Sequence, residues 1–395
     1  LDRFDLVWEL TADGAAMTSG KIERPAVAPG AAKAVRLALP RFEAQPGVEY
    51  FLNVSLRARD DWAGVPKGHV VAAEQLPFPA GGPVAPPPEQ PLPALAVDDG
   101  PRFVRVSGAA LAVRFDKATG ALDSFVYQGR ELVASAIEPN FWRAPTDNDF
   151  GNQMPRRLGI WRQASLYRDL RSISAQETGP GWVSVAVEYG FAGGAATEVL
   201  NYLIGGDGRI TIAGKLSFRE AGKLPEMPRV GLKMAVPAAY KDVRWFGRGP
   251  FESYGDRKTA AFVGRYGTTA GEPCPYVSPQ EYGNRTDTRW LAVRDAEGWG
   301  LLVTGHPLFE FSAHPYGPED LTQTSRGSKH PPEIQKRDHV CLTLDAAQMG
   351  VGGDDSWGAR IHPQYTIPAQ DRGFRLTLRP LRPGDDPAAA AKAGR

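Results

Sequence analysis

Several short polar motifs of this sequence contain carboxylates, and paired carboxylates are the machinery of glycosidases. The chain also carries nine tryptophans, which suit contact with sugar rings. Retaining glycosidases hold two carboxyl groups ~5 to 5.5 Å apart, one of them protonated, usually on rigid strand ends. Here the acids fall in motifs rich in Gly, Pro and Asn: Asp147 and Asp149 in RAPTDNDFG, Glu252 and Asp256 in GPFESYGDR, Glu281 in SPQEYGNR, and Asp354 and Asp355 in MGVGGDDSW. Since such acids commonly bond the backbone of turns, the sequence predicts structural rather than catalytic roles for them. We expect Arg143 with Asp147 and Asp149, and Glu281 with Arg285, to tie loops together by salt bridges and turn bonds.

Other catalytic and metal-binding chemistries find little support. None of the six histidines forms an HxH or an i, i+4 pair, so a zinc-type site is not predicted. An oxygen-only cation site on Asp147, Asn148 and Asp149 lacks the ligand spacing of an EF-hand. The nucleophile motif GxSxG is absent from the sequence, and GRGP and GVGGDD lack the following helix that a phosphate-binding loop needs. We predict no catalytic and no metal-binding residue in this chain.

Trp357 is the residue of these motifs best suited to bind a ligand. Two glycines and two acids directly precede it, which predicts a sharp turn at this point of the chain. The segment MGVGGDDSW contains Gly352, Gly353, Asp354 and Asp355 directly before it. A loop tryptophan can offer its face to the apolar side of a sugar ring. The alternative is that the indole closes the end of a β-sandwich core, and composition alone favours that alternative.

The elements that must carry these motifs are strands. The chain has 44 Gly and 35 Pro, which punctuate short strands. Period-two alternation appears in three stretches, with one face formed by Tyr50, Leu52, Val54 and Leu56, by Val183, Val185 and Val187, and by Phe374, Leu376 and Leu378. Turn residues at 116–120 and 205–208 predict tight reversals between neighbouring strands. The predicted class is therefore all-β with an antiparallel sandwich architecture.

Length and proline content predict more than one domain. The 395 residues exceed what one compact core usually holds. The segment PFPAGGPVAPPPEQPLP cannot continue a strand ladder, because proline lacks the amide donor. We predict an immunoglobulin-like sandwich at 1–78, a proline-rich linker at 79–94, a large multi-stranded domain at 95–384 and a disordered tail at 385–395.

Composition limits the partners. With 46 basic and 45 acidic residues the formal net charge is +1, so neither nucleic acid nor an anionic membrane is predicted as a partner. The two cysteines, Cys274 and Cys341, do not form a metal or disulfide motif. The opening segment LDRFDLVWEL does not resemble a signal peptide, and the default expectation is a cytoplasmic protein.

Four long stretches carry a family resemblance. They are NFWRAPTDNDFG (140–151), WFGRGPFESYGDRKTAAFVGRY (245–266), PYVSPQEYGNRTDTRWL (275–291) and MGVGGDDSW (349–357). In this order they resemble the small-chain domain of glycoside hydrolase family 2 β-galactosidases. The first ~75 residues resemble, more weakly, the immunoglobulin-like domain that precedes it in that family.

This resemblance implies an immunoglobulin-like β-sandwich followed by a large antiparallel supersandwich of the galactose mutarotase-like class. It also implies that the catalytic glutamates come from a barrel that this chain lacks, and that Mg²⁺ and Na⁺ serve the parent enzyme but not this fragment. The fragment alone would be inactive. The implied partners are a β-galactoside such as lactose, the missing N-terminal catalytic part and, for the parent, further copies in a homo-oligomer. Trp357 would stack on the aglycone side of the substrate.

Two other functions remain open at this stage. A free-standing carbohydrate-binding module would need Trp357 and its neighbours to bind sugar unaided. An aldose 1-epimerase would need a general acid and base, for which His306 or His314 with Glu310 could be nominated.

The sequence departs slightly from the family pattern at Gly358, where a serine is usual, and at the alanine-rich end.

Overall fold

The computed structural model describes residues 1–78, 82, 91–355 and 357–393. The chain divides into two compact units, Leu1–Pro87 with Thr259–Arg265, and Pro88–Lys258 with Tyr266–Arg395. Most of the predicted proline-rich linker at 79–94 lies outside the described residues.

The first unit contains a four-stranded antiparallel sheet in the order β2-β1-β3-β4. Its strands are β1 (Phe4–Ala12), β2 (Ala15–Glu23), β3 (Tyr50–Ala58) and β4 (Val70–Phe78). Tyr50 and Leu52 are buried as their alternation predicts, whereas Val54 and Leu56 farther along the same strand are only half-buried.

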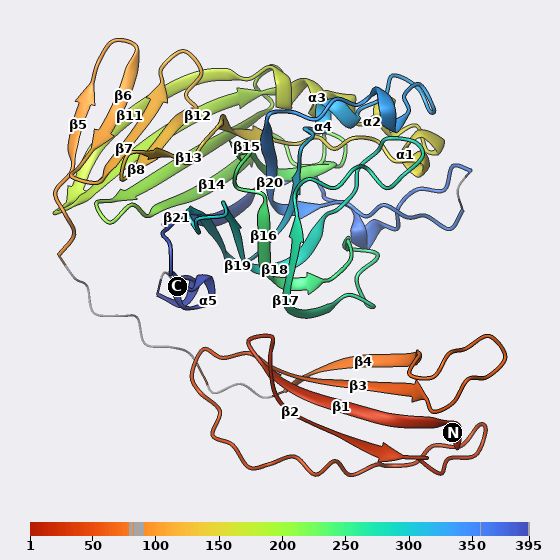
Figure 1. Ribbon diagram of the computed structural model, residues 1–395. Coiled ribbons are helices and arrows are strands. Elements are labelled where there is room, and N and C mark those ends of the chain that lie inside the picture. The colour runs from red at the N-terminus through yellow and green to blue at the C-terminus, as the bar shows by residue number, and fades with distance from the viewer. Residues whose placement is uncertain (79–81, 83–90, 356, 394–395) are drawn as a thin grey trace. The chain divides into compact units, whose positions relative to one another are not determined.

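The remaining strands within the described residues form one hydrogen-bonded network of 17 strands, β5 to β21 (Figure 1). The first nine are β5 (Ala96–Asp99), β6 (Phe103–Ser107), β7 (Leu111–Asp116), β8 (Leu122–Tyr127), β9 (Arg130–Glu131), β10 (Ser135–Asn140), β11 (Asp169–Gly179), β12 (Trp182–Phe191) and β13 (Ala196–Gly205). The others are β14 (Ile210–Phe218), β15 (Arg229–Pro237), β16 (Asp242–Gly249), β17 (Phe262–Thr269), β18 (Arg285–Arg294), β19 (Gly300–His314), β20 (His339–Gln348) and β21 (Arg372–Leu381). The all-β prediction is confirmed.

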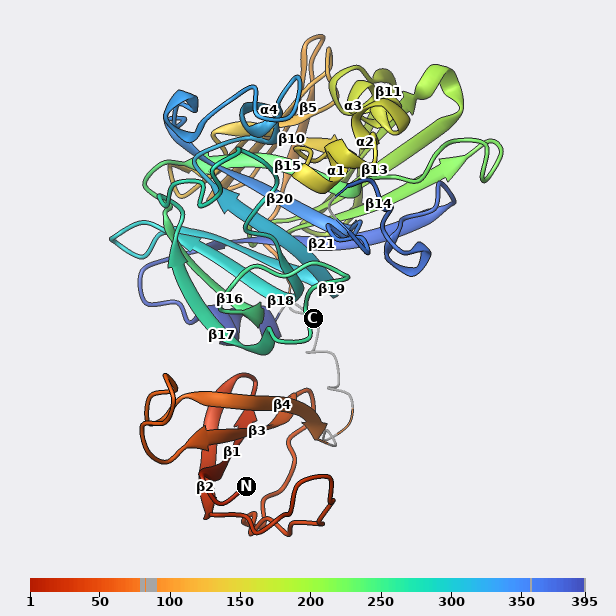
Figure 2. The ribbon, with the colours of Figure 1, turned by 90° about the vertical axis from the view of Figure 1, so that its right-hand side faces the viewer.

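Short helices interrupt the strands. They are α1 (Asp147–Gly151), α2 (Met154–Arg157), α3 (Gly159–Leu166), α4 (Pro318–Leu321), α5 (Pro387–Lys392) and the 3₁₀ turns η1 (Ala192–Gly194), η2 (Pro331–Glu333) and η3 (Pro363–Tyr365). The first three follow β10 without a long break and lie together in both ribbon views (Figures 1 and 2).

Burial in the second unit follows the period-two pattern. Val183, Val185 and Val187 on β12 are fully buried, as are Leu200 and Tyr202 on the neighbouring β13. The reversal predicted at 205–208 joins β13 to β14, where Gly208 has a φ of 93° that favours glycine. Alternating strands and turn glycines therefore act together to build this core.

The expectation of a disordered tail at 385–395 is wrong for most of that segment. Asp386 caps α5 by accepting the amide of Ala388, and Pro387 occupies the first turn, where its missing N–H costs nothing. Ala388 and Ala391 are buried, and Arg379 donates to the Ala390 carbonyl. The small alanine side chains suit close packing of a short helix, which the sequence interpretation overlooked.

Candidate functional site

Trp357 is exposed on the loop that follows β20. Its side chain is 85% accessible, which excludes the alternative that it closes a sandwich core. Full exposure of so large an apolar group is unusual and often marks a binding surface. The structure thus leaves the indole face free for a ligand.

The base of this loop is held by three polar side chains from distant motifs. Asp256 accepts the amides of Val351 and Gly352 at 3.1 and 2.7 Å. Arg143 donates to the carbonyl oxygens of Met349 and Gly350 at 2.7 and 2.8 Å. Backbone groups that would otherwise be left unpaired in a loop are satisfied in this way.

Asn148 supplies the third anchor, through its side-chain amide to the Val351 carbonyl at 3.1 Å. Its helix α1 begins with a capping box, in which Thr146 accepts the Asp149 amide and Asp149 accepts the Thr146 amide. Asp149 also receives two hydrogen bonds from Arg143, at 3.1 and 2.9 Å, and both side chains are buried. The sequence prediction that Arg143 and Asp149 join loops is confirmed.

The glycines of the loop are explained by close contacts rather than by unusual φ angles. A Cβ atom on Gly350 would lie 2.4 Å from a carboxylate oxygen of Asp256, and one on Gly352 would lie 3.1 Å from it. A Cβ on Gly353 would lie 2.8 Å from the carbonyl oxygen of Ala359. Any larger residue would push the backbone away from its anchor.

The two acids before the tryptophan have different roles. One carboxylate oxygen of Asp355 accepts the amides of Trp357, Gly358 and Ala359 at 2.8 to 3.1 Å. These bonds lower the pKa of Asp355, the amide of Trp357 contributing most. Asp354 instead lies 2.7 Å from a ring nitrogen of His362. Sequence reasoning assigned backbone bonds to both acids and did not find His362.

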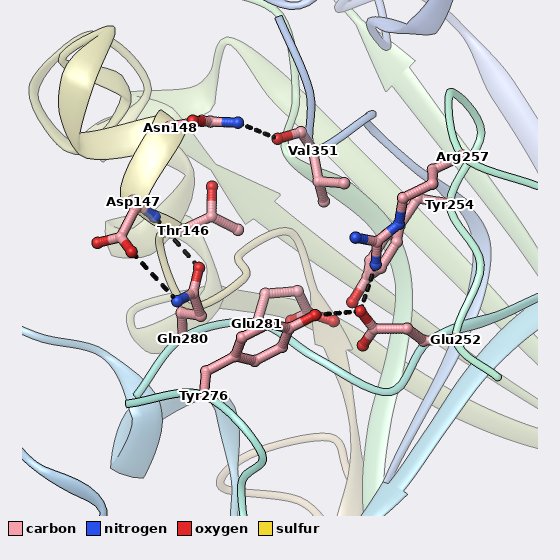
Figure 3. Close-up of a pocket in the computed structure, with 10 residues that line it drawn as sticks. All are labelled: Thr146, Asp147, Asn148, Glu252, Tyr254, Arg257, Tyr276, Gln280, Glu281 and Val351. Carbon is pink, nitrogen blue, oxygen red and sulfur yellow. Dashed lines mark hydrogen bonds and ion pairs between the residues drawn. The ribbon is translucent and has the colours of Figure 1, made fainter. Parts of the chain in front are cut away.

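A polar pocket of about 140 Å³ lies beside the loop base (Figure 3). It is lined by Thr146, Asp147, Asn148, Glu252, Tyr254, Arg257, Tyr276, Gln280, Glu281 and Val351. Three of the motifs noted in the sequence meet here with the segment that leads to Trp357. Figure 3 shows Glu252 joined to Arg257 and to the hydroxyl of Tyr276, and Asp147 joined to Gln280.

A buried ionic network supports one wall of this pocket. Glu281 pairs with Arg229 at 3.0 Å, and Arg229 pairs with Asp345 at 3.2 Å. Burial raises the pKa of Asp345 well above its ordinary value, and Arg229 opposes that shift. We expected Glu281 to act with Arg285; the structure gives it Arg229 instead, while Arg285 donates to the Gly283 carbonyl. Arg229 carries no motif signal, so sequence reasoning missed it.

The residues nominated for an epimerase are bound to separate neighbours. His314 lies 3.0 Å from the carbonyl oxygen of Tyr282, and burial lowers the pKa of His314 to about 4. Burial raises the pKa of Glu310 to about 7, and its carboxylate accepts a hydrogen bond from Asn284. His306 lies 3.2 Å from the hydroxyl of Thr377 on β21. These partners indicate structural roles for all three.

Possible metal ligands do not cluster in the described part of the chain. Over the residues that the structure describes, no group of three or more His, Cys, Asp or Glu side chains could hold a metal ion. None of the helices in the described part of the chain is long and apolar enough to span a bilayer.

The fold and the loop define a β-rich scaffold with an exposed indole on a loop whose base, at Val351, lines a polar pocket. Comparison with known proteins then specifies the family. The sequence profile of the β-galactosidase small chain matches residues 107–378, and that of β-galactosidase domain 4 matches residues 1–79. The chain belongs to the β-galactosidase small-chain family.

Relatives agree with this assignment. A β-galactosidase from Priestia megaterium is 36% identical over 389 residues, which are 96% of this chain and 36% of that protein. One from Halalkalibacterium halodurans is 35% identical over 332 residues, 82% of this chain and 32% of that protein. The chain thus spans about a third of the length of these relatives.

Among solved structures, a galactose 1-epimerase from Lactobacillus acidophilus covers 73% of this chain and 99% of its own, with 7% identity and a TM-score of 0.36. A likeness of this size carries no functional argument.

Proposed function

We propose that this chain is the C-terminal portion of a β-galactosidase that hydrolyses terminal β-D-galactose residues of β-galactosides such as lactose. The family assignment and the identity over nearly the whole chain support this proposal. Since the chain spans only about a third of such relatives, the catalytic glutamates would be supplied by the remaining part of the enzyme. That part is the principal partner we propose.

The role we assign to this portion is to provide a scaffold and one wall of the substrate pocket. The observation that carries it is the 85% exposure of Trp357 on a loop whose base is fixed by Arg143 and Asp256. A rigidly held aromatic face can stack on a sugar with little loss of conformational entropy. Trp357 would contact the aglycone side of the substrate and would position it without taking part in bond cleavage.

The test is the substitution Trp357→Ala in the full-length β-galactosidase that carries this chain. Loss of a stacking wall costs about 1 to 3 kcal/mol of binding, so KM for lactose should rise about 5- to 150-fold. The melting temperature should stay unchanged, because an exposed side chain contributes little to folding. Trp62→Ala is the matched control, since Trp62 is the other strongly exposed tryptophan and lies in the first unit. An unaltered KM in Trp357→Ala would refute the role.

Three finer expectations stay proposals. Mg²⁺ and Na⁺ would be bound by the catalytic part of the parent enzyme rather than by the residues described here. The parent would assemble as a homo-oligomer. A cytoplasmic location is favoured by the two free cysteines, Cys274 and Cys341.

A further inference from the structure

The loop of Trp357 is anchored at its base, but its tip needs a restraint of its own. The three side-chain anchors of the base all bond to residues 349–352. Trp357 lies farther along the chain, in the segment 353–359, which we call the loop tip. Gly352 and Gly353 join base and tip, and glycine restricts the backbone least of all residues. The anchors of the base therefore do not by themselves fix the direction of the indole.

The loop tip has an internal structure that does not attach it to the rest of the molecule. Asp355 accepts the amides of Trp357, Gly358 and Ala359, and all four residues belong to the tip. Gly353 closely approaches the carbonyl oxygen of Ala359, so the two ends of the tip lie together. These contacts give the tip its shape, and they leave its orientation to be set from outside.

His362 provides a link from the tip to the following segment. Its Nε2 atom lies 2.7 Å from Oδ1 of Asp354. Because a carboxylate only accepts hydrogen bonds, the imidazole donates in this pair. Among the described residues, this is the only hydrogen bond that the side chains of the tip make to a residue outside 353–359. Gly358 also packs near the carbonyl of Gly151 in α1.

His362 is itself held in a fixed turn. It directly precedes η3, where Pro363 restricts φ and the amide of Tyr365 donates to the His362 carbonyl at 2.9 Å. The Tyr365 carbonyl in turn accepts the amide of Gly350 at 2.9 Å, so η3 is bonded to the loop base. The imidazole thus connects the tip to backbone that is already anchored.

From this geometry we propose that His362 is a positioning residue for Trp357, a role that rests on the proposed function of the indole as a wall of the substrate pocket. The bond from His362 to Asp354 holds the loop tip in one orientation, so less conformational freedom is lost when a sugar stacks on the indole. His362 acts through Asp354 and does not contact the substrate. Since both partners are exposed, removal of the bond should weaken binding only about two- to fivefold.

The first test follows the loop tip in the purified chain by ¹⁵N relaxation of the backbone amides of Trp357 and Gly358. We expect order parameters near the rigid value of about 0.85 in the wild type and a fall toward the flexible range near about 0.6 in His362→Ala. His362→Gln should keep the wild-type values, because its side-chain amide can donate to Asp354. His330→Ala is the matched control, since His330 is also exposed and also precedes a 3₁₀ turn that begins with proline, η2. Equal order parameters in His362→Ala and the wild type would overturn the proposal.

The second test measures kinetics in the full-length β-galactosidase. His362→Ala should raise KM for lactose about two- to fivefold with little change in kcat. The effect should be smaller for methyl β-D-galactopyranoside, because its aglycone is a single methyl group. Asp354→Ala should reproduce the effect, and the double variant should be no worse than either single variant, since both residues act through one bond. His362→Gln should restore the wild-type KM.

The combined results separate this proposal from the proposed function. If Trp357→Ala raises KM for lactose and His362→Ala does not, the indole is positioned without His362 and the proposal is overturned. Additive effects of Asp354→Ala and His362→Ala would overturn it as well. If the tip loosens in His362→Ala but neither His362→Ala nor Trp357→Ala alters KM, the restraint by His362 is supported, and the role of Trp357 as a pocket wall is the part that fails.

Discussion

Glu198 is a carboxylic acid inside the core of the second unit, and its ionisation should control the pH dependence of stability. It lies on β13 opposite Tyr189 of β12, is 0% exposed, and neither carboxyl oxygen has a hydrogen-bond partner among the described residues. Burial raises the pKa of Glu198 from 4.5 to about 8, a shift that Arg168 only partly opposes. The folded protein therefore keeps this side chain protonated at neutral pH.

The size and sign of the effect follow from this shift. The unfolded chain releases the proton near pH 4.5, whereas the folded chain holds it until about pH 8. The stability associated with the protonated form is therefore fully present below pH 4.5 and is lost as the pH rises to about 8. One pKa unit corresponds to about 1.4 kcal/mol, so the loss between pH 5 and pH 8 is on the order of 3 kcal/mol. The substitution Glu198→Gln removes the ionisable group and should remove this loss.

Urea unfolding followed by tryptophan fluorescence would measure the effect at pH 5.5 and pH 8.5. We expect the stability of Glu198→Gln relative to the wild type to be greater at pH 8.5 than at pH 5.5 by on the order of 3 kcal/mol. Glu177→Gln is the control, because Glu177 is exposed on β11, which β12 separates from β13. Glu310 and Asp345 also have raised pKa values, but they contribute equally to the pH dependence of stability in the wild type and in Glu198→Gln.

The comparison between the two pH values decides the matter. A difference between Glu198→Gln and the wild type that is the same at pH 5.5 and pH 8.5 would refute the reasoning. It would mean that a bound water or a rearranged side chain stabilises the ionised form of Glu198 in the folded state.

Two further predictions concern the loop and the isolated chain. Asp256→Ala removes the carboxylate that holds Val351 and Gly352, so amide hydrogen exchange in residues 349–358 should become about tenfold faster or more. Asp371→Ala, which removes a carboxylate from the Phe218 amide elsewhere, should leave exchange in 349–358 unchanged, and an equal effect of both would contradict the anchoring role. The purified chain alone should leave lactose intact and let freshly dissolved α-galactose equilibrate at the buffer rate in a proton NMR time course. Cleavage or faster mutarotation would place a reaction centre within this chain.

The sequence predicts the strands well because their determinants are local. Alternation at Val183, Val185 and Val187 and the turn at 205–208 each depend on a few neighbouring residues. The same alternation places Glu198 on the inner face with Leu200 and leaves Val199 exposed, although residue type alone would suggest the reverse. At positions 198 and 199, strand periodicity therefore predicts which side chain is buried better than side-chain hydrophobicity does.

The candidate site is less accessible from sequence because its contacts are long-range. Arg143 contacts the Met349 carbonyl across 206 positions of the chain, and Arg229 reaches Glu281 across 52. Neither spacing follows from propensity or periodicity. The motifs around Arg143 and Glu281 were found, but their partners depend on how the loops meet in three dimensions. Trp357 was likewise ambiguous until its exposure was known.

The anchoring of the loop limits how it could be engineered. Arg143, Asn148 and Asp256 come from segments distant in sequence, yet all three bond to the backbone of residues 349–352. Grafting only the segment MGVGGDDSW onto another β-scaffold would therefore transfer the tryptophan without its orientation. A successful transplant would have to include the α1 turn and the segment around Asp256, so the smallest portable unit is three loops rather than one.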